Sequence, residues 1–367
     1  SRFVLYSVRL DGTAPPVLLG PPAGSVQSFR LSPDSAHVVF HTLESSSRKV
    51  LHSVPVEGGA LVELHVAETF QANIGEYRIG AGGARVVYLF RPNSSFSGQL
   101  YTIPIDGSAP RQRFGGTGVS PAEFELTAHD QEVVYSVGTG GPIYELYLAP
   151  IDASASLRLN PPLPAGPVGN FPTFRVSPDG TRVAYLVDQE VDGQFRLYSV
   201  PTDGSQVFSA LTAPLPAGAQ VWPDFRISPD SEHLIFLTDA ADVGTFELYS
   251  VPLAGGAPAV RLNGPLSSGN GFALAFGDPA PFVLAGERVA YALDQEVAGR
   301  FELYVAPASG WRAGRKVNEP LQEGPNDALP FAFNGAGELV FLAPQDLPGV
   351  PELFLRPLTE IPRHRQR

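Results

Sequence analysis

The chain lacks cysteine and methionine altogether and has only two lysines, Lys49 and Lys316. Without cysteine it can form no disulfide, no cysteine-ligated zinc site, no iron–sulfur cluster and no thiol nucleophile. Its 37 Asp+Glu outnumber its 25 Lys+Arg, which gives a formal net charge of −12 and a pI near 5.0. Surfaces that bind nucleic acid or anionic membranes need clustered basic residues, so this charge argues against both. No apolar run approaches the ~20 residues that span a bilayer.

Two catalytic signatures are also missing from the sequence. There is no Gly-x-Ser-x-Gly nucleophile elbow, and no strand–helix alternation that would support one. The glycine-rich segment Gly80-Ala-Gly-Gly83 is a degenerate copy of a repeated turn, so it does not indicate a phosphate-binding loop. These absences favour binding over nucleophilic catalysis.

Glycine (38) and proline (37) are abundant, as is typical of many short strands joined by tight turns. With 43% hydrophobic residues the chain can bury a large core. A length of 367 residues would ordinarily suggest two or three domains, unless an internal repeat makes the chain one.

Such a repeat is present, and it divides the chain into seven units. Each unit opens on an aromatic residue, 47 to 57 residues after the previous one. The opening aromatics are Phe29, Tyr77, Phe124, Phe174, Phe225, Phe282 and Phe331.

Each unit has the pattern of four strands, as the unit that starts at Phe174 illustrates. A short strand ends at Ser-Pro-Asp-Gly, where proline presets φ and glycine accepts the turn. An apolar β-branched run follows at 183–187, and then Leu-Tyr-Ser-Val-Pro at 197–201, whose proline ends the third strand. A second turn leads into the fourth strand. Four strands in every unit of about 50 residues predict a β-propeller.

This series of motifs resembles the WD40-like repeats of TolB-type propellers over about residues 3–358. The motif is clearest in the units that start at Phe29, Phe174 and Phe225. Proteins with such repeats include periplasmic binding scaffolds, surface proteins, propeller domains of prolyl peptidases and a few lyases. The resemblance, together with the first residue Ser1 in place of methionine, implies an extracytoplasmic bacterial protein that is periplasmic, secreted or on the cell surface.

The predicted fold is all-β, a seven-bladed β-propeller of four-stranded antiparallel blades in a single domain over 1–367. Residues 1–20 supply a strand to the last blade, so that the N- and C-terminal strands share it and close the ring. Tyr6 and Phe354 both lie in copies of the third strand, which leaves that blade with one strand too many. Either copy is then displaced or pairs with another chain, which would permit strand exchange or oligomerisation.

The longest and most varied segments are the loops from each fourth strand to the next first strand. Together with the hairpins between second and third strands, they form one side of the blades, which we call the loop face; the tight turns form the turn face. Loops on a rigid scaffold commonly carry function, so we place a binding site there, although these proline-rich loops could also only cap the blades. The candidate partner-binding residues are Phe171, Trp222, Asp224, Asn270, Asp278, Asn326 and Asp327.

One hairpin has the spacing of the first half of a calcium loop, with Gly193 at its sixth position. Arg196 and Ser199 stand where such a loop needs further ligands, so a solvated acidic hairpin is the alternative. The candidate calcium ligands are Asp188, Glu190 and Asp192.

Three histidines of one unit, His41, His52 and His65, would form a metal site only if their side chains converged from three different strands. The leading prediction is therefore a non-catalytic scaffold that binds a protein partner, another ligand or a larger assembly, with no cofactor apart from the candidate calcium. One alternative is a metal-dependent lyase or hydrolase acting at the axial mouth of the ring. Another is a structural subunit of a surface layer, filament or envelope assembly.

Overall fold

A computed structural model describes residues 2–21, 24–93, 98–115, 120–128, 131–138, 144–161, 173–191, 193–266, 271–272, 281–321, 330–344 and 350–357. Regular structure in these ranges consists of β-strands, and they contain no helix long and apolar enough to cross a membrane. The chain divides into two compact units. Unit 1 comprises Ser1–Pro172 and Pro201–Gln206, and unit 2 comprises Thr173–Val200 and Val207–Arg367.

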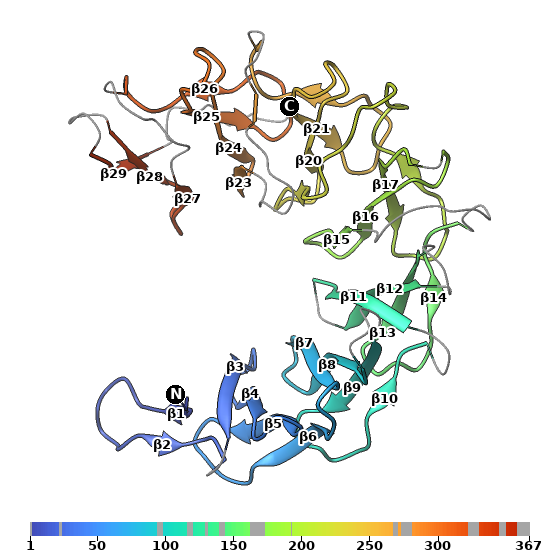
Figure 1. The fold of residues 1–367 in the computed structure, drawn as a ribbon, viewed down its shortest axis with the longest axis vertical. Helices are drawn as coiled ribbons and strands as arrows, with labels where there is room; N and C mark the ends of the chain where they lie inside the picture. The colour runs from blue at the N-terminus through green and yellow to red at the C-terminus, as the bar shows by residue number, and fades with distance from the viewer. Residues whose placement is uncertain are drawn as a thin grey trace, which may run out of the picture. The chain divides into compact units, whose positions relative to one another are not determined.

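Unit 1 is built from antiparallel sheets that follow one another along the chain (Figure 1). Its strands are β1 (Tyr6–Ser7), β2 (Val17–Leu18), β3 (Ser25–Leu31), β4 (His37–Leu43), β5 (Lys49–Pro55), β6 (Val62–Ala67), β7 (Asn73–Ile79), β8 (Arg85–Arg91), β9 (Gln99–Pro104), β10 (Gln112–Arg113), β11 (Ser120–Leu126), β12 (Glu132–Gly138), β13 (Tyr144–Pro150) and β14 (Leu157–Arg158). β1 pairs with β2, and the others form the four-stranded sheets β3–β6, β7–β10 and β11–β14.

Unit 2 continues the same pattern. Its strands are β15 (Phe174–Val176), β16 (Arg182–Val187), β17 (Arg196–Pro201), β18 (Ser209–Ala210), β19 (Arg226–Ile227), β20 (His233–Thr238), β21 (Glu247–Pro252), β22 (Val260–Arg261), β23 (Phe282–Ala285), β24 (Arg288–Leu293), β25 (Glu302–Pro307), β26 (Arg315–Lys316), β27 (Phe331–Phe333), β28 (Leu339–Ala343) and β29 (Glu352–Arg356). They form the four-stranded sheets β15–β18, β19–β22 and β23–β26 and the three-stranded sheet β27–β29.

The seven predicted repeat units thus form seven consecutive antiparallel sheets, as a seven-bladed propeller requires. The strand pair β1–β2 belongs to unit 1 and the three-stranded sheet to unit 2. The shared closing blade and the single-domain organisation therefore stay predictions.

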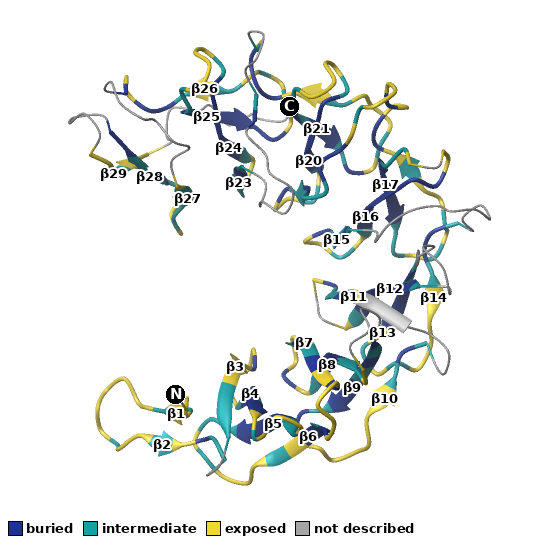
Figure 2. Ribbon diagram, in the orientation of Figure 1, coloured by how far each residue is buried: buried dark blue, intermediate teal, exposed yellow. Residues whose placement is uncertain are grey.

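Each of the seven sheets contains one stacked aromatic pair that joins its second and third strands. Ring centroids in these pairs are 5.0–5.9 Å apart. The pairs are Phe40–His52, Tyr88–Tyr101, Tyr135–Tyr147, Tyr185–Tyr198, Phe236–Tyr249, Tyr291–Tyr304 and Phe341–Phe354. The second-strand member is buried in every sheet, in line with the buried second strands in Figure 2.

The opening aromatics of the repeat pack between consecutive sheets within a unit. Phe225 contacts a core that contains Leu186 and Leu197 of the preceding sheet, and Tyr77 packs with Val39 and Leu51 in the same way. Phe29 opens the first four-stranded sheet of unit 1, and it is 63% exposed. Phe174 opens the first sheet of unit 2 and is buried, so the two units differ at this position.

The Ser-Pro-Asp turns of the turn face form as predicted. In the turn at Ser177, the serine hydroxyl donates to Asp179 Oδ1 at 2.6 Å, and Asp179 Oδ1 also accepts from the backbone N–H of Thr181 at 3.0 Å. Gly180 has φ +75°, a left-handed conformation that glycine adopts without strain. The same hydroxyl–carboxylate contact recurs at Ser32–Asp34 and Ser228–Asp230.

Serines of the Leu-Tyr-Ser-Val-Pro segments tie neighbouring sheets of unit 2 together. The buried Ser199 hydroxyl donates to the carbonyl of Leu253 at 2.5 Å, and Ser250 donates in the same way to the carbonyl of Ala308. Each acceptor lies in the turn after the third strand of the next sheet. The sequence motif therefore encodes contacts between blades as well as within them.

We expect Ser250→Ala to lower the free energy of unfolding of unit 2 by about 1–3 kcal/mol, because the carbonyl of Ala308 loses its buried donor. Both tryptophans, Trp222 and Trp311, belong to unit 2, so urea unfolding followed by tryptophan fluorescence measures this change. Ser309→Ala, at an exposed turn position, is the matched control and should leave the transition unchanged. An unchanged Ser250→Ala transition would show that this contact contributes nothing.

Candidate functional site

Three loop-face hairpins of unit 2 begin with a buried aspartate: Asp188, Asp239 and Asp294. In each hairpin, Oδ2 of the aspartate accepts a hydrogen bond from the backbone N–H of a glycine five residues later. The N···O distances are 3.0 Å for Gly193, 2.8 Å for Gly244 and 2.8 Å for Gly299. All three glycines have positive φ, a backbone conformation that glycine adopts without strain. The residue that donates the hydrogen bond to the aspartate is therefore also the one at which the turn requires glycine. The aspartates act as turn anchors.

The second carboxylate oxygen fastens the long loop that precedes the same sheet. Asp239 Oδ1 accepts from the backbone N–H of Gln220 at 2.5 Å, and Asp294 Oδ1 accepts from that of Gly271 at 2.7 Å. A buried carboxylate thus holds a hairpin on one side and a loop on the other. Asp188 Oδ1 has no partner among the described residues, and the corresponding loop, 162–172, lies outside them.

The candidate calcium ligands are held in different ways. Asp188 is the buried anchor, whereas Glu190 forms an ion pair with Arg196. Arg196 also donates to the carbonyl of Thr212, so its guanidinium joins the hairpin to the segment that follows β18. Asp192 lies outside the described residues. The described ranges contain no group of three or more His, Asp or Glu side chains arranged to hold a metal ion, and the calcium site stays a prediction.

Trp222 lies in the core and not on the surface. Its indole is only 8% exposed and packs edge-on against Phe246, with ring centroids 5.5 Å apart. Its backbone N–H donates to the carbonyl of Leu237 at 2.9 Å. The buried ring therefore anchors its loop to the core of the sheet.

Asp224 is partly exposed and lies two residues before β19, the first strand of its sheet. It pairs with Arg226 at 3.6 Å, and this guanidinium lies 5.4 Å from the ring centroid of Phe282 in the next sheet. The guanidinium of Arg226 thus contacts both a carboxylate and an aromatic ring. The remaining partner-binding candidates lie outside the described residues: Phe171, Asn270, Asp278, Asn326 and Asp327.

Buried asparagines at the ends of the fourth strands escaped sequence-based prediction. The side-chain oxygens of Asn160, Asn263 and Asn318 each accept from a third-strand backbone N–H at 2.8 Å. The recurring Leu-Asn or Val-Asn before a proline-containing loop was the signal that could have identified them. These residues fix the point at which each long loop leaves its sheet.

In three sheets, an ion pair joins the third strand to the fourth strand. Glu145 pairs with Arg158 at 3.0 Å, and Glu247 pairs with Arg261 at 2.7 Å. In β23–β26, the third-strand Glu302 pairs with Lys316 of the fourth strand at 3.1 Å. In all three sheets the acid lies on the third strand and the base on the fourth.

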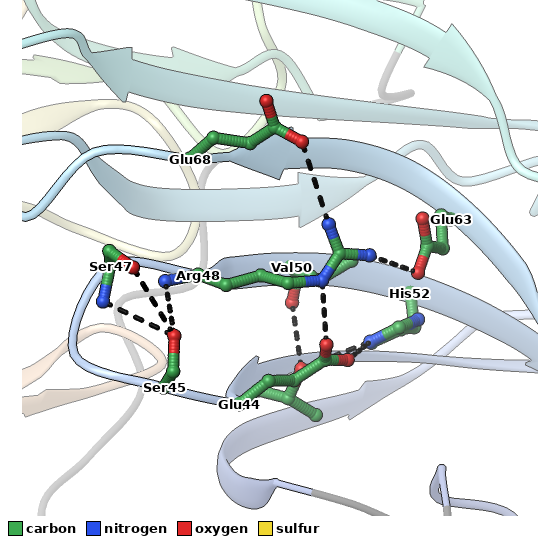
Figure 3. Close-up of polar contacts among 9 residues, drawn as sticks. Glu44, Ser45, Ser47, Arg48, Val50, His52, Glu63 and Glu68 are labelled. Atoms are coloured by element: carbon green, nitrogen blue, oxygen red, sulfur yellow. Dashed lines mark hydrogen bonds and ion pairs between the residues drawn. The ribbon is translucent and has the colours of Figure 1, made fainter.

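The sheet β3–β6 carries a different arrangement (Figure 3). Glu63 of its fourth strand lies opposite His52, the position that Arg261 occupies opposite Tyr249. The base comes instead from the hairpin: Arg48 binds Glu44 at 2.8 Å, Glu63 at 2.7 Å and Glu68 at 3.8 Å. One guanidinium is therefore shared by three carboxylates.

His52 takes the place of the usual tyrosine in the stacked pair of this sheet. Its Nε2 lies 3.0 Å from Thr42 Oγ1 and 3.4 Å from Glu44 Oε1. Burial lowers the pKa of His52, although the carboxylates of Glu44 and Glu63 oppose this effect. The ring is therefore a buried part of the hydrogen-bonded network.

His65 and His41 do not join a metal site in the described residues. His65 Nδ1 lies 2.9 Å from the hydroxyl of Tyr88, and burial lowers the pKa of this histidine to about 4. Burial, followed by the charge of Lys49, lowers the pKa of His41 to about 4 as well.

Comparisons with known proteins agree with this architecture. No protein-family model and no curated protein matches the chain. The chain is similar to a solved prolyl endopeptidase with a TM-score of 0.52 and 15% identity, over 91% of this chain and 50% of that one. The chain is a seven-bladed β-propeller.

Two further solved structures have lower TM-scores. An oligogalacturonate lyase from Vibrio parahaemolyticus has a TM-score of 0.45 at 12% identity, over 90% of the propeller and 88% of that chain. A protein assigned as TolB from Agrobacterium tumefaciens has a TM-score of 0.37 at 16% identity, over 65% and 80%. The propeller spans half of the prolyl endopeptidase chain, and identities this low establish the fold alone.

We expect Asp239→Asn to lower the stability of unit 2 by about 1–3 kcal/mol, because an amide has one acceptor oxygen for the two backbone N–H donors. Asp242→Asn, an exposed position in the same hairpin, is the control and should cost much less. Urea unfolding followed by tryptophan fluorescence compares the two. Equal effects of the two substitutions would contradict the anchoring role.

Acid should destabilise unit 1 through its histidines. The pKa of His65 is about 4 in the folded protein and near 6.5 when unfolded, so between these pH values only the unfolded chain binds the proton. The free energy of unfolding then falls as the pH drops from about 6.5 to 4, by at most about 1.4 kcal/mol per pH unit for this histidine. Above pH 7 the effect is absent.

His65→Gln should reduce this slope, as measured by urea unfolding followed by circular dichroism at pH 7, 6 and 5. The comparison uses the slope and not the absolute stability, because the substitution also removes the contact with Tyr88. A slope identical to that of the original protein would refute the contribution of His65.

Proposed function

We propose that the propeller is a non-catalytic scaffold outside the cytoplasm that binds a protein partner through its loop face. The observation that carries this proposal is the anchoring of the loop-face segments by buried side chains. Asp239 and Asp294 each hold a hairpin and a long loop together, and Asn263 and Asn318 fix where the loops leave their sheets. Loops held in one conformation lose little conformational entropy on binding, which favours recognition.

The ionisable groups of these hairpins support the same proposal. Three of these groups are buried and form hydrogen bonds with neighbouring backbone groups: Asp239, Asp294 and Arg196. Their roles are structural, so they favour a scaffold over an acid–base catalyst. The resemblance of the repeats to TolB-type propellers supports a location outside the cytoplasm.

The surface of unit 2 offers separate positions for testing the two faces. Asp224 and the hairpin tip Val243, which is 53% exposed, lie on the loop face. Glu232 is exposed on the turn face of the same sheet. Trp222→Ala is unsuitable, because truncating a buried indole costs about 3–5 kcal/mol in stability.

We expect Asp224→Ala combined with Val243→Ser to weaken the capture of a partner from the envelope fraction of the native source at least fivefold. Quantitative cross-linking followed by mass spectrometry measures this, with Glu232→Ala as the control that retains capture. Unchanged capture by the loop-face variant, or loss of capture by the control alone, would overturn the assignment of the loop face.

A further inference from the structure

The most exposed aromatic side chain in the described part of unit 1 lies on a short loop-face turn between β6 and β7. Phe70 is 75% exposed. Two residues before it, Glu68 has a side chain that is 78% exposed and reaches toward Arg48 at 3.8 Å. An aromatic ring and a carboxylate are therefore presented to solvent from the same turn. We call Glu63, Glu68 and Phe70 the Phe70 surface.

The turn that carries Phe70 is held from two directions. The backbone N–H of Ala72 donates to the carbonyl and to the hydroxyl of Thr69, both at 3.1 Å. From the neighbouring hairpin, Lys49 Nζ donates to the carbonyl of Ala72 at 2.6 Å and to that of Phe70 at 3.4 Å. One of the two lysines of the chain is thus used to fix this turn. The backbone of the turn is therefore fixed, which lowers the conformational entropy lost when Phe70 contacts a partner.

Beside this turn, three carboxylates gather around one cation. Glu44, Glu63 and Glu68 share the single guanidinium of Arg48, as Figure 3 shows. Lys49 donates to the backbone carbonyls of the turn and does not pair with these carboxylates in the described contacts. Glu68 is the most exposed of the three and has the longest contact with Arg48, so its carboxylate has room for a second cation.

We infer that the Phe70 surface binds an arginine or lysine side chain of a protein partner, with the cation over the ring of Phe70 and paired with Glu68. A cation is attracted both to an aromatic face and to a carboxylate. The chain itself uses this combination where Arg226 pairs with Asp224 and lies over Phe282. The excess of carboxylates and the net charge of −12 disfavour anionic partners such as phospholipid or nucleic acid.

This inference rests on the proposed function, because it names the partner chemistry for one part of the loop face. It concerns unit 1, whereas the capture experiment above changes unit 2. The two experiments therefore give distinguishable failures: unchanged capture by the unit 2 variant counts against the loop-face assignment in unit 2, whereas unchanged peptide binding by Phe70→Ala counts against the Phe70 surface.

The test is selection of randomised 12-residue peptides on the purified full chain, followed by fluorescence anisotropy with the selected peptides. We expect enrichment of arginine or lysine beside an apolar residue. Phe70→Ala should weaken binding of those peptides at least tenfold, and Glu68→Gln at least threefold. Phe70→Tyr keeps an aromatic ring and should retain binding. Raising the salt concentration should weaken binding to the original protein more than to Glu68→Gln.

Two matched variants control for general effects of losing an exposed aromatic or an exposed carboxylate in unit 1. Phe3→Ala removes another exposed aromatic, and Glu57→Gln neutralises an exposed carboxylate in the turn after β5. Both should bind the selected peptides as the original protein does. Selection that yields no basic peptides, or basic peptides that bind Phe70→Ala undiminished, would overturn the inference.

Discussion

The stacked aromatic pair between the second and third strands is the interaction on which the rest of each blade depends. A shift of one residue in strand register would turn one ring of the pair to the opposite face of the sheet, so the pair specifies a single register. Pairs such as Tyr291–Tyr304 lie in the buried centre of the sheet. With the register set, the serine after the third-strand tyrosine reaches the next sheet, and the acid two residues before that tyrosine reaches the fourth strand.

The loop face is held by a second set of buried groups, which are polar. Asp239 and Asp294 each satisfy two backbone donors, one in the hairpin and one in the preceding loop. Buried carboxylates are costly unless their hydrogen bonds are complete, so the benefit of these residues is the fixed position of the loops. A surface built in this way suits recognition. In unit 1, the same edge instead presents Phe70 on a turn held by Lys49.

The sequence was sufficient to predict the seven sheets formed by the repeat units and the order of their strands, because turn motifs and apolar runs are local and repeat seven times. The candidate site stays a prediction, because five of its seven partner-binding residues and one of its three calcium ligands lie outside the described residues. Trp222 was named as a partner-binding candidate because it lies in a long loop, and in the structure its ring packs against Phe246. Asp188 matched a calcium spacing, and its observed contact is with the Gly193 amide. The asparagines were overlooked because their partners lie about 15 residues away, on the neighbouring strand.

The sequence by itself determined the all-β class, the seven sheets and the Ser-Pro-Asp turns, because each depends on contacts between residues close in the chain. It also excluded every chemistry that needs cysteine. Only the tertiary structure decided which polar groups are buried anchors and which are exposed. That distinction arises when loops, hairpins and neighbouring sheets pack together. Phe29 and Phe225 occupy the same repeat position, yet one is exposed and the other is buried by the sheet before it.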